Sequence, residues 1–140
     1  MSLNTYLIFH DNCRDVLEFY RSVFGGEFMS VETFRNGPPG MDIPEEEKDR
    51  IMHMSLPIGS SVLMGSDLCS AFGPPPVFGD NFYISFSADT KDEADDRFAK
   101  LSDGGEVEMD MQDMFWGAYF GALKDKFGIK WQVSYTPPQE

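Results

Sequence analysis

The chain has 140 residues, of which 41% are hydrophobic and 14% aromatic, and its formal net charge at pH 7 is −13. This length and apolar content are sufficient for one compact domain with a hydrophobic core. An acidic surface repels phosphate backbones and anionic lipids, so we expect neither a nucleic-acid partner nor a membrane partner.

The sequence also lacks targeting segments and cysteine motifs, which bears on where the protein is found and on how its cysteines are used. The N-terminus shows no basic region followed by an apolar core, and no apolar run approaches ~18 residues, so we predict a cytoplasmic protein. Cys13 and Cys69 stand alone, without C-x-x-C spacing. We therefore interpret both as reduced thiols rather than as parts of a disulfide framework or a zinc site.

The first elements along the chain are a strand, a helix and a second strand. Residues 3–10 are apolar and β-prone, and the side-chain oxygen of Asp11 or Asn12 could cap the helix that follows. Gly25-Gly26 would end that helix by supplying positive φ, and residues 27–35 indicate a strand. The apolar residues at helical spacing are Val16, Phe19, Tyr20, Val23 and Phe24.

A loop and a hairpin complete the first half. Residues 36–48 are rich in Gly, Pro and acidic residues and indicate a loop, in which we interpret the run Glu45-Glu46-Glu47 as a solvated face or a cap. Residues 49–56 and 60–67 are typical of a hairpin that turns near Pro57-Ile58-Gly59. Residues 68–80 contain three successive prolines and predict a linker.

The second half repeats this order of elements. Residues 81–89 indicate a strand, and Asp89 or Thr90 could cap a helix that ends at Gly104-Gly105. The apolar face of that helix would consist of Ala94, Phe98 and Leu101. Three further strands are predicted, at residues 106–112, 116–125 and 129–135.

The tripeptide GGE follows both predicted helices, at residues 25–27 and 104–106. It marks the same helix exit in two copies of one βαβββ unit. The sequence therefore predicts an α+β fold of two such modules, residues 3–67 and 81–135, joined by the Pro-rich linker. Pairing of two modules, within the chain or across a dimer, would close a cleft between curved mixed sheets.

Several stretches of the sequence resemble the vicinal oxygen chelate superfamily, which includes glyoxalases, bleomycin-resistance proteins and extradiol dioxygenases. The resemblance is closest to its PhnB-like branch and covers more than half of the chain. It is carried by YLIF (6–9), CRDVLEFYRSVFGGE (13–27), EEKDRIMHMSLPIGSSVLMGSD (46–67) and MFWGAYFGALKDKFGIKWQV (114–133). The resemblance implies the glyoxalase fold, a homodimer and a ligand-binding cleft.

Members of the superfamily with a full active site hold one divalent metal through one residue on each of four strands. The resemblance places Thr5, Ser55, Tyr83 and Gln132 at these positions. Hydroxyl groups and a phenol are poor metal ligands at neutral pH, and only Gln132 could serve, weakly. We therefore expect no metal site and no cofactor, and a divalent metal would require a different register.

The two histidines, His53 and His10, are further candidates for functional groups. His53 lies two residues before Ser55, so both side chains would point to one face of a strand. It is a weak candidate for a general acid or base and for a metal ligand, and the plainer interpretation is a hydrogen-bonded residue at the cleft wall. We interpret His10, at a strand-to-helix junction, as a surface residue.

Aromatic side chains supply further candidates for the cleft. Trp116 and Tyr119 would join Tyr83 to form aromatic walls, which suit a small, partly apolar ligand. Core packing is the alternative for these residues, and the segment around Trp116 could instead lie at a dimer surface.

The expected function is small-molecule binding in a cleft that lacks the superfamily's metal ligands. Two alternatives stay open: a metal-dependent lyase, isomerase or dioxygenase, and a protein that sequesters a drug, for which an acidic chain could attract a cationic compound. The methyltransferase name carried by some PhnB-like proteins has no support, because the sequence contains no glycine-rich nucleotide turn. The sequence is compatible both with an enzyme and with a binding protein.

Overall fold

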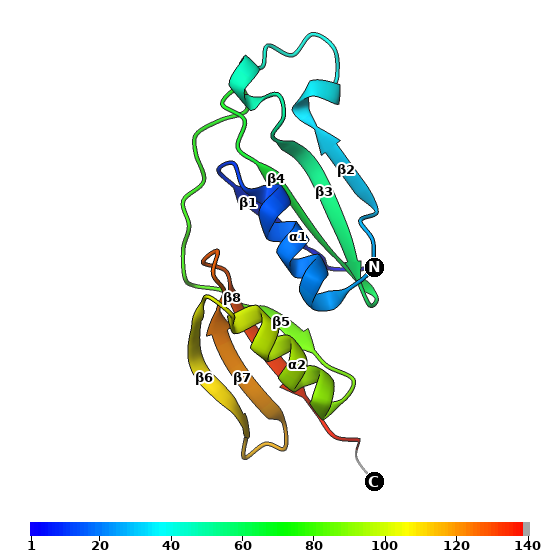
Figure 1. Cartoon of the computed structure of the whole chain (residues 1–140), viewed down its shortest axis with the longest axis vertical. Coiled ribbons are helices and arrows are strands. Elements are labelled where there is room, and N and C mark those ends of the chain that lie inside the picture. Colours follow the sequence, from blue (N-terminus) through cyan, green and yellow to red (C-terminus); the bar gives the residue numbers. More distant parts are fainter. Residues whose placement is uncertain (139–140) are drawn as a thin grey trace. The chain divides into compact units, whose positions relative to one another are not determined.

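The structure is a computed structural model that describes residues 1–138, and it divides into two compact units, Met1–Phe78 and the chain from Gly79 onward. Each unit is a βαβββ module (Figure 1), which confirms the predicted fold class. The first unit contains β1 (Thr5–Phe9), α1 (Cys13–Phe24), β2 (Ser30–Thr33), β3 (Ile51–Ile58) and β4 (Ser61–Asp67). The second contains β5 (Ile84–Ser87), α2 (Lys91–Ser102), β6 (Glu106–Asp113), β7 (Tyr119–Lys124) and β8 (Lys130–Tyr135).

The first sheet has the strand order β1-β4-β3-β2, with β1 parallel to β4 and the other pairs antiparallel. Helix α1 covers one face of this sheet. A Cβ atom on Gly65 of β4 would lie 3.1 Å from Cys13 Sγ and 3.4 Å from Leu17 Cδ2, so the α-carbon of Gly65 faces the helix closely. We call the face covered by α1 the helix face and the opposite face the open face.

The second sheet repeats this topology as β5-β8-β7-β6, with β5 parallel to β8. A Cβ atom on Gly121 of β7 would lie 2.9 Å from the ring of Phe98 in α2, so Gly121 marks the helix face here. Its partner Val133 of β8 is fully buried on the same face. The same two names, helix face and open face, are used for this sheet.

The core of each unit lies between its helix and its sheet. The predicted apolar stripe Ala94, Phe98 and Leu101 of α2 is buried, as expected from its helical spacing. In α1 the buried residues are Cys13, Val16, Leu17, Tyr20 and Val23. Neither helix in the described part of the chain is long and apolar enough to cross a membrane.

The two helices begin differently. Thr90 caps α2 as predicted, because its side-chain oxygen accepts the Glu93 N–H at 3.0 Å. The predicted cap of α1 by Asp11 or Asn12 is wrong, since Asn12 occupies the position but makes no side-chain capping bond. The first N–H of α1, that of Cys13, instead donates to Asp67 of β4 at 2.8 Å.

Both helices end at the repeated glycines. Gly25 and Gly26 have φ values of 81° and 88°, and Gly104 has a φ of 77°, which side chains with a Cβ rarely adopt. The repeated GGE therefore follows the helix in each unit, as predicted, but it begins directly after α1 and one residue later after α2, whose C-cap is Asp103.

Several predicted boundaries differ from those observed. The strand predicted at 27–35 is shorter, and the predicted loop 36–48 includes two turns of 3-10 helix, Phe34–Asn36 at its start and Glu45–Glu47. Strand β7 begins at Tyr119, so Trp116 lies in the turn before it rather than in a strand. The segment 68–80 contains no helix or strand.

Candidate functional site

The open face of the first sheet carries a mixture of aromatic, apolar and polar side chains. Its first row across the strands pairs Tyr6 with Met64, Met64 with Ser55, and Ser55 with Ser30. Thr5 pairs with Leu63 and alternates with Tyr6, so Thr5 lies on the helix face and is not brought together with Ser55. Tyr6 is the residue that β1 contributes to the open face at this row.

A hydrogen-bonded pair of side chains, one from the edge strand β1 and one from β3, lies on this face. The phenol oxygen of Tyr6 lies 3.2 Å from His53 Nδ1, and the two rings stack with centroids 5.7 Å apart. Ser55 is buried, and its hydroxyl shares a hydrogen bond of 2.8 Å with that of Ser30. His53 and Ser55 lie on one face, as predicted from their spacing, and His53 makes the hydrogen bond that its plainer interpretation expected.

The open face of the second sheet is polar at its centre. Gln132 of β8 pairs with Ser85 of β5 and with Ala122 of β7. Because Val133 faces the helix, the side chains of Gln132 and its paired neighbours alternate onto the open face. The amide of Gln132 thus lies between the hydroxyl of Ser85 and the methyl group of Ala122.

Tyr83 takes part in a charged cluster of the second unit. Its hydroxyl donates to Glu108 at 2.9 Å, and Lys130 Nζ lies 4.4 Å from the centre of its ring. Lys130 also pairs with Glu108 at 3.2 Å. The pKa of Lys130 lies above its usual value, first because of hydrogen bonding with Tyr83 and then because of Glu108. Within this cluster, the positive charge of Lys130 is balanced by the negative charge of Glu108.

Tyr119 and Trp116 lie elsewhere. Tyr119 of β7 alternates with Gly121 onto the helix face, where its hydroxyl donates to Asp95 of α2 at 2.6 Å. That hydrogen bond raises the pKa of Tyr119 to about 12. Trp116, in the turn before β7, is 56% exposed and contacts the ring of Phe120 edge-on at 6.3 Å. The structure therefore does not bring Tyr119 together with Gln132.

The four positions that the resemblance assigns to metal ligands do not fit a divalent metal. Thr5 lies on the helix face, the Ser55 hydroxyl bonds to Ser30, and the Tyr83 phenol donates to Glu108. Gln132 alone would supply a neutral amide oxygen, whereas such sites need roughly three good donors. Within residues 1–138, no group of three or more His, Cys, Asp or Glu side chains is arranged to hold a metal.

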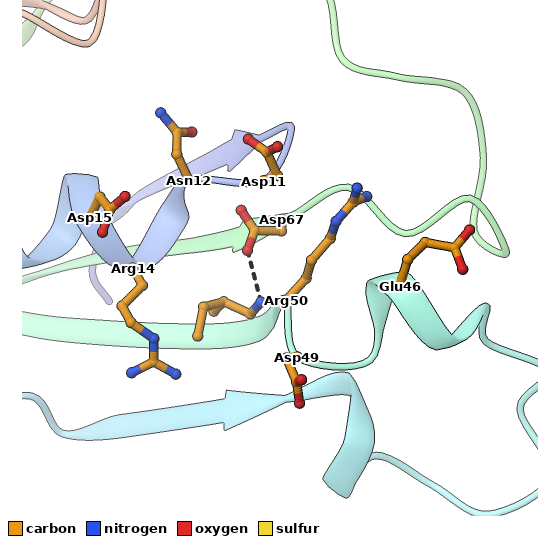
Figure 2. A pocket seen from close by; sticks show the side chains of 9 residues that line it. Asp11, Asn12, Arg14, Asp15, Glu46, Asp49, Arg50 and Asp67 are labelled. Atoms are coloured by element: carbon orange, nitrogen blue, oxygen red, sulfur yellow. Dashed lines mark hydrogen bonds between the residues drawn. The ribbon is translucent and has the colours of Figure 1, made fainter.

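A separate polar pocket of about 400 Å³ opens in the first unit beside the start of α1 (Figure 2). Its most buried carboxylate, Asp67, accepts hydrogen bonds from the backbone N–H groups of Cys13 and Ile51, each at 2.8 Å. Burial raises the pKa of Asp67 although both bonds oppose the rise. The lining residues are Asp11, Asn12, Arg14, Asp15, Glu46, Asp49, Arg50, Ile51 and Asp67.

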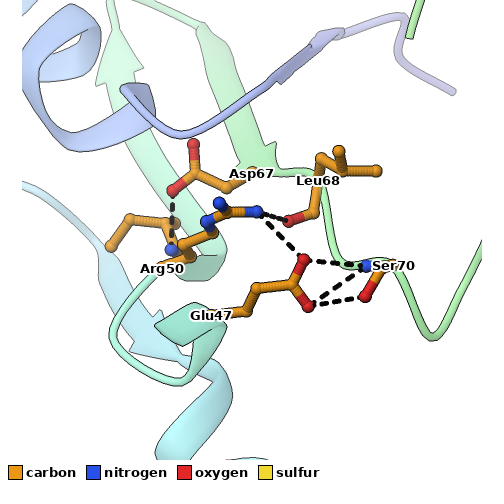
Figure 3. Close-up of polar contacts among 6 residues, drawn as sticks. Glu47, Arg50, Asp67, Leu68 and Ser70 are labelled. Atoms are coloured by element: carbon orange, nitrogen blue, oxygen red, sulfur yellow. Dashed lines mark hydrogen bonds and ion pairs between the residues drawn. The ribbon is translucent and has the colours of Figure 1, made fainter. Parts of the chain in front are cut away.

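The glutamate run near this pocket is not wholly solvated, so its interpretation is wrong for Glu47. The Glu47 side chain is buried, pairs with Arg50 at 3.1 Å and accepts the Ser70 hydroxyl at 2.7 Å (Figure 3). Arg50 also donates to the Leu68 carbonyl oxygen at 3.3 Å. These bonds fix the start of the segment that follows β4, which is a structural role.

The remaining single candidates are not arranged for catalysis. Cys13 is fully buried, and burial raises the pKa of its thiol to about 12, so it carries little thiolate at neutral pH. His10 is exposed, as predicted, and its ring stacks on Phe78 with centroids 5.4 Å apart.

Sequence reasoning missed two residues that organise these regions. Tyr6 lies in a continuous apolar run, in which both faces of the strand look alike. Strand alternation places Tyr6 on the face opposite Leu7 and Phe9, which are buried in the structure. Asp67 gave no local signal, because its partners Cys13 and Ile51 are distant in the sequence.

Comparisons with known proteins agree with this fold. The model of the Glyoxalase/Bleomycin resistance protein/Dioxygenase superfamily matches residues 2–133. Protein YjdN of Escherichia coli is 29% identical over 99% of this chain and 98% of its own length. The solved structure of protein PA1353 from Pseudomonas aeruginosa is 36% identical, with a TM-score of 0.82 over 97% of this chain and 98% of that one.

A more distant solved structure is the PhnB protein from Bacillus cereus, which is 23% identical with a TM-score of 0.75. The match covers 97% of this chain and 100% of that one. It is described provisionally as a 3-demethylubiquinone-9 3-methyltransferase. At this level of identity the likeness concerns the fold alone.

Proposed function

Because this chain belongs to the Glyoxalase/Bleomycin resistance protein/Dioxygenase superfamily, we propose that it binds a small, partly apolar molecule on the open faces of its sheets. We propose further that this binding requires no divalent metal. The side chains available as metal ligands support this proposal. Thr5 faces the helix, and the hydroxyl groups of Ser55 and Tyr83 are already hydrogen-bonded to other side chains.

One observation carries this proposal. The faces that the helices leave uncovered hold hydrogen-bonding side chains, His53 and Tyr6 in one unit and Gln132 and Ser85 in the other. Tyr6 is also 43% exposed, so an aromatic surface lies next to a polar group. Sites for small ligands combine apolar and aromatic walls with a few placed polar groups.

Should the bound molecule be converted, His53 is the side chain on these faces suited to proton transfer near neutral pH. Gln132 and the phenol of Tyr83 would orient the ligand through hydrogen bonds. Turnover by a ligand-loaded protein, lost in a His53→Gln variant, would support an enzyme.

The experiment that tests metal independence is elemental analysis of protein purified without a metal-affinity tag. It is repeated after addition of Zn²⁺, Ni²⁺, Mn²⁺ and Fe²⁺ in turn. We expect metal well below one equivalent per chain under every condition. A value near one equivalent would contradict the proposal and direct attention to metal-dependent lyase, isomerase or dioxygenase activity.

A second candidate function, sequestration of a cationic compound, is favoured by the net charge of −13. It predicts stoichiometric binding that weakens with added salt and leaves the ligand chemically unchanged. Recovery of a modified ligand would exclude this candidate.

We also propose that the protein is a homodimer. Phe115 and Trp116, in the turn before β7, are 97% and 56% exposed, and large exposed aromatics are enriched at protein interfaces. Sedimentation equilibrium tests this, and a monomer at all concentrations would contradict it. A Trp116→Ser variant should weaken the dimer.

A further inference from the structure

We propose that Tyr6 fixes the tautomer of His53, so that His53 presents its Nε2–H group to an acceptor oxygen of a flat, uncharged or cationic ligand. This inference rests on the proposed function, because it names the class of ligand for the open face of the first sheet. It concerns a pair that joins β1 to β3 across 47 positions in the sequence.

We infer the direction of the Tyr6–His53 hydrogen bond from the acidity of the two groups. A phenol ordinarily holds its proton until pH is about 10, whereas a neutral imidazole nitrogen is a good acceptor. The two groups share a hydrogen bond of 3.2 Å, and we assign the Tyr6 hydroxyl as its donor and His53 Nδ1 as its acceptor. A neutral imidazole that accepts at Nδ1 must carry its single proton on Nε2.

The other ring nitrogen is available to a ligand. Within residues 1–138, the structure records no hydrogen bond from His53 Nε2 to protein. The ring itself is held by its stacking on Tyr6, with an interplanar angle of 26°. A donor that is oriented but not satisfied within the described chain selects ligands that bring an acceptor, such as a carbonyl oxygen.

The surroundings of the pair define the rest of the ligand. On the open face, β1 exposes Tyr6 and Ile8 by 43% and 45%, which offers an aromatic and apolar surface to a flat ring. Glu32 of β2 pairs directly with His53. With Glu32 beside the donor and a net charge of −13, an anionic ligand is disfavoured.

The tautomer is tested without any ligand. Nitrogen-15 NMR of the histidine side chains at about pH 8, where imidazoles are ordinarily neutral, distinguishes protonated from unprotonated ring nitrogens. We expect His53 to carry its proton on Nε2 in the native protein and to populate both tautomers in Tyr6→Phe. His10, the only other histidine in the sequence, is the internal control and should not change. A proton on Nδ1, or identical spectra for both proteins, would overturn the proposal.

The ligand class is tested with two matched probes, benzamide and benzoate, which share a ring but differ in charge. We expect benzamide to shift the ring signals of Tyr6 and His53 saturably. Its affinity should fall about two- to tenfold in Tyr6→Phe, as loss of one oriented hydrogen bond implies. Benzoate should bind more weakly than benzamide by a similar factor or more.

The outcomes separate this inference from the proposed function. Benzoate binding as tightly as benzamide, or equal benzamide affinity in Tyr6→Phe, would overturn the inference while small-molecule binding on the open face still holds. If neither probe shifts Tyr6 or His53, the ligand class is wrong. If, in addition, no compound in a broad screen shifts any open-face residue, the proposed function fails as well.

Discussion

The carboxylate of Asp67, at the end of β4, accepts the backbone N–H of Cys13, the first residue of α1, at 2.8 Å. Its second oxygen accepts the N–H of Ile51, the first residue of β3, at the same distance. One side chain thus joins a helix start to two strands. It replaces the cap that Asn12 does not provide.

We predict that Asp67→Asn lowers the free energy of unfolding by about 1–3 kcal/mol. An asparagine has one accepting oxygen, so its NH₂ group would oppose the N–H of either Cys13 or Ile51 in a buried site. Urea unfolding measures the effect. Asp11→Asn, at an exposed residue of the same pocket, should change stability by no more than about 0.5 kcal/mol, and equal losses in both variants would contradict the assigned role.

The fold could be predicted from the sequence because its signals are local. Helical spacing in Ala94, Phe98 and Leu101, the cap at Thr90 and the glycine exits at Gly25 and Gly104 each act within a few residues. The strand boundaries were less certain, because the turn before β7 contains Phe115 and Trp116, which resemble strand residues.

The candidate site was predicted less completely because it depends on register. A shift of one residue moves a strand side chain to the other face. Thr5 and Tyr119 were expected in the cleft, and both lie on helix faces, whereas Tyr6 takes a place on the open face. His53 and Ser55 lie on the same face, as predicted, because residues two apart in one strand share a face whatever the register.

We predict that Tyr119 links stability to pH in the alkaline range. Its hydrogen bond to Asp95 raises the pKa of the phenol in the folded protein to about 12 from an ordinary value of 10.0. The folded state therefore holds the proton more tightly than the unfolded chain. This stabilisation is complete below about pH 10 and is lost as pH rises through about 12.

Urea unfolding of the native protein and of Tyr119→Phe at several pH values measures the effect. Below pH 10 the variant should be less stable by about 0.5 kcal/mol, the low end for one hydrogen bond, because this bond is exposed. The difference should vanish towards pH 12. A difference that stays constant across this range would show that the bond does not shift the pKa.

The two tryptophans should differ sharply in their importance for stability. Trp131 is 2% exposed, and its indole N–H donates to Asp125 at 3.0 Å, whereas Trp116 is 56% exposed. We predict that Trp131→Phe costs more than about 2 kcal/mol, because it removes buried volume and a hydrogen bond to a buried carboxylate. Trp116→Phe should cost about 0.5 kcal/mol or less. Comparable losses, measured by urea unfolding, would contradict these placements.

The central claim is that a small molecule binds the open faces without a metal. It is tested most directly by a melting-temperature screen of small, partly apolar compounds in the presence of a chelator. Each compound that raises the melting temperature is then measured on His53→Leu and Gln132→Leu, with His10→Leu as the matched control.

We expect at least one compound to raise the melting temperature in chelator, as a ligand of the native state must. His53→Leu or Gln132→Leu should reduce this rise, and His10→Leu should leave it unchanged. Stabilisation that appears only when a divalent metal replaces the chelator, or that survives both open-face variants, would contradict the claim.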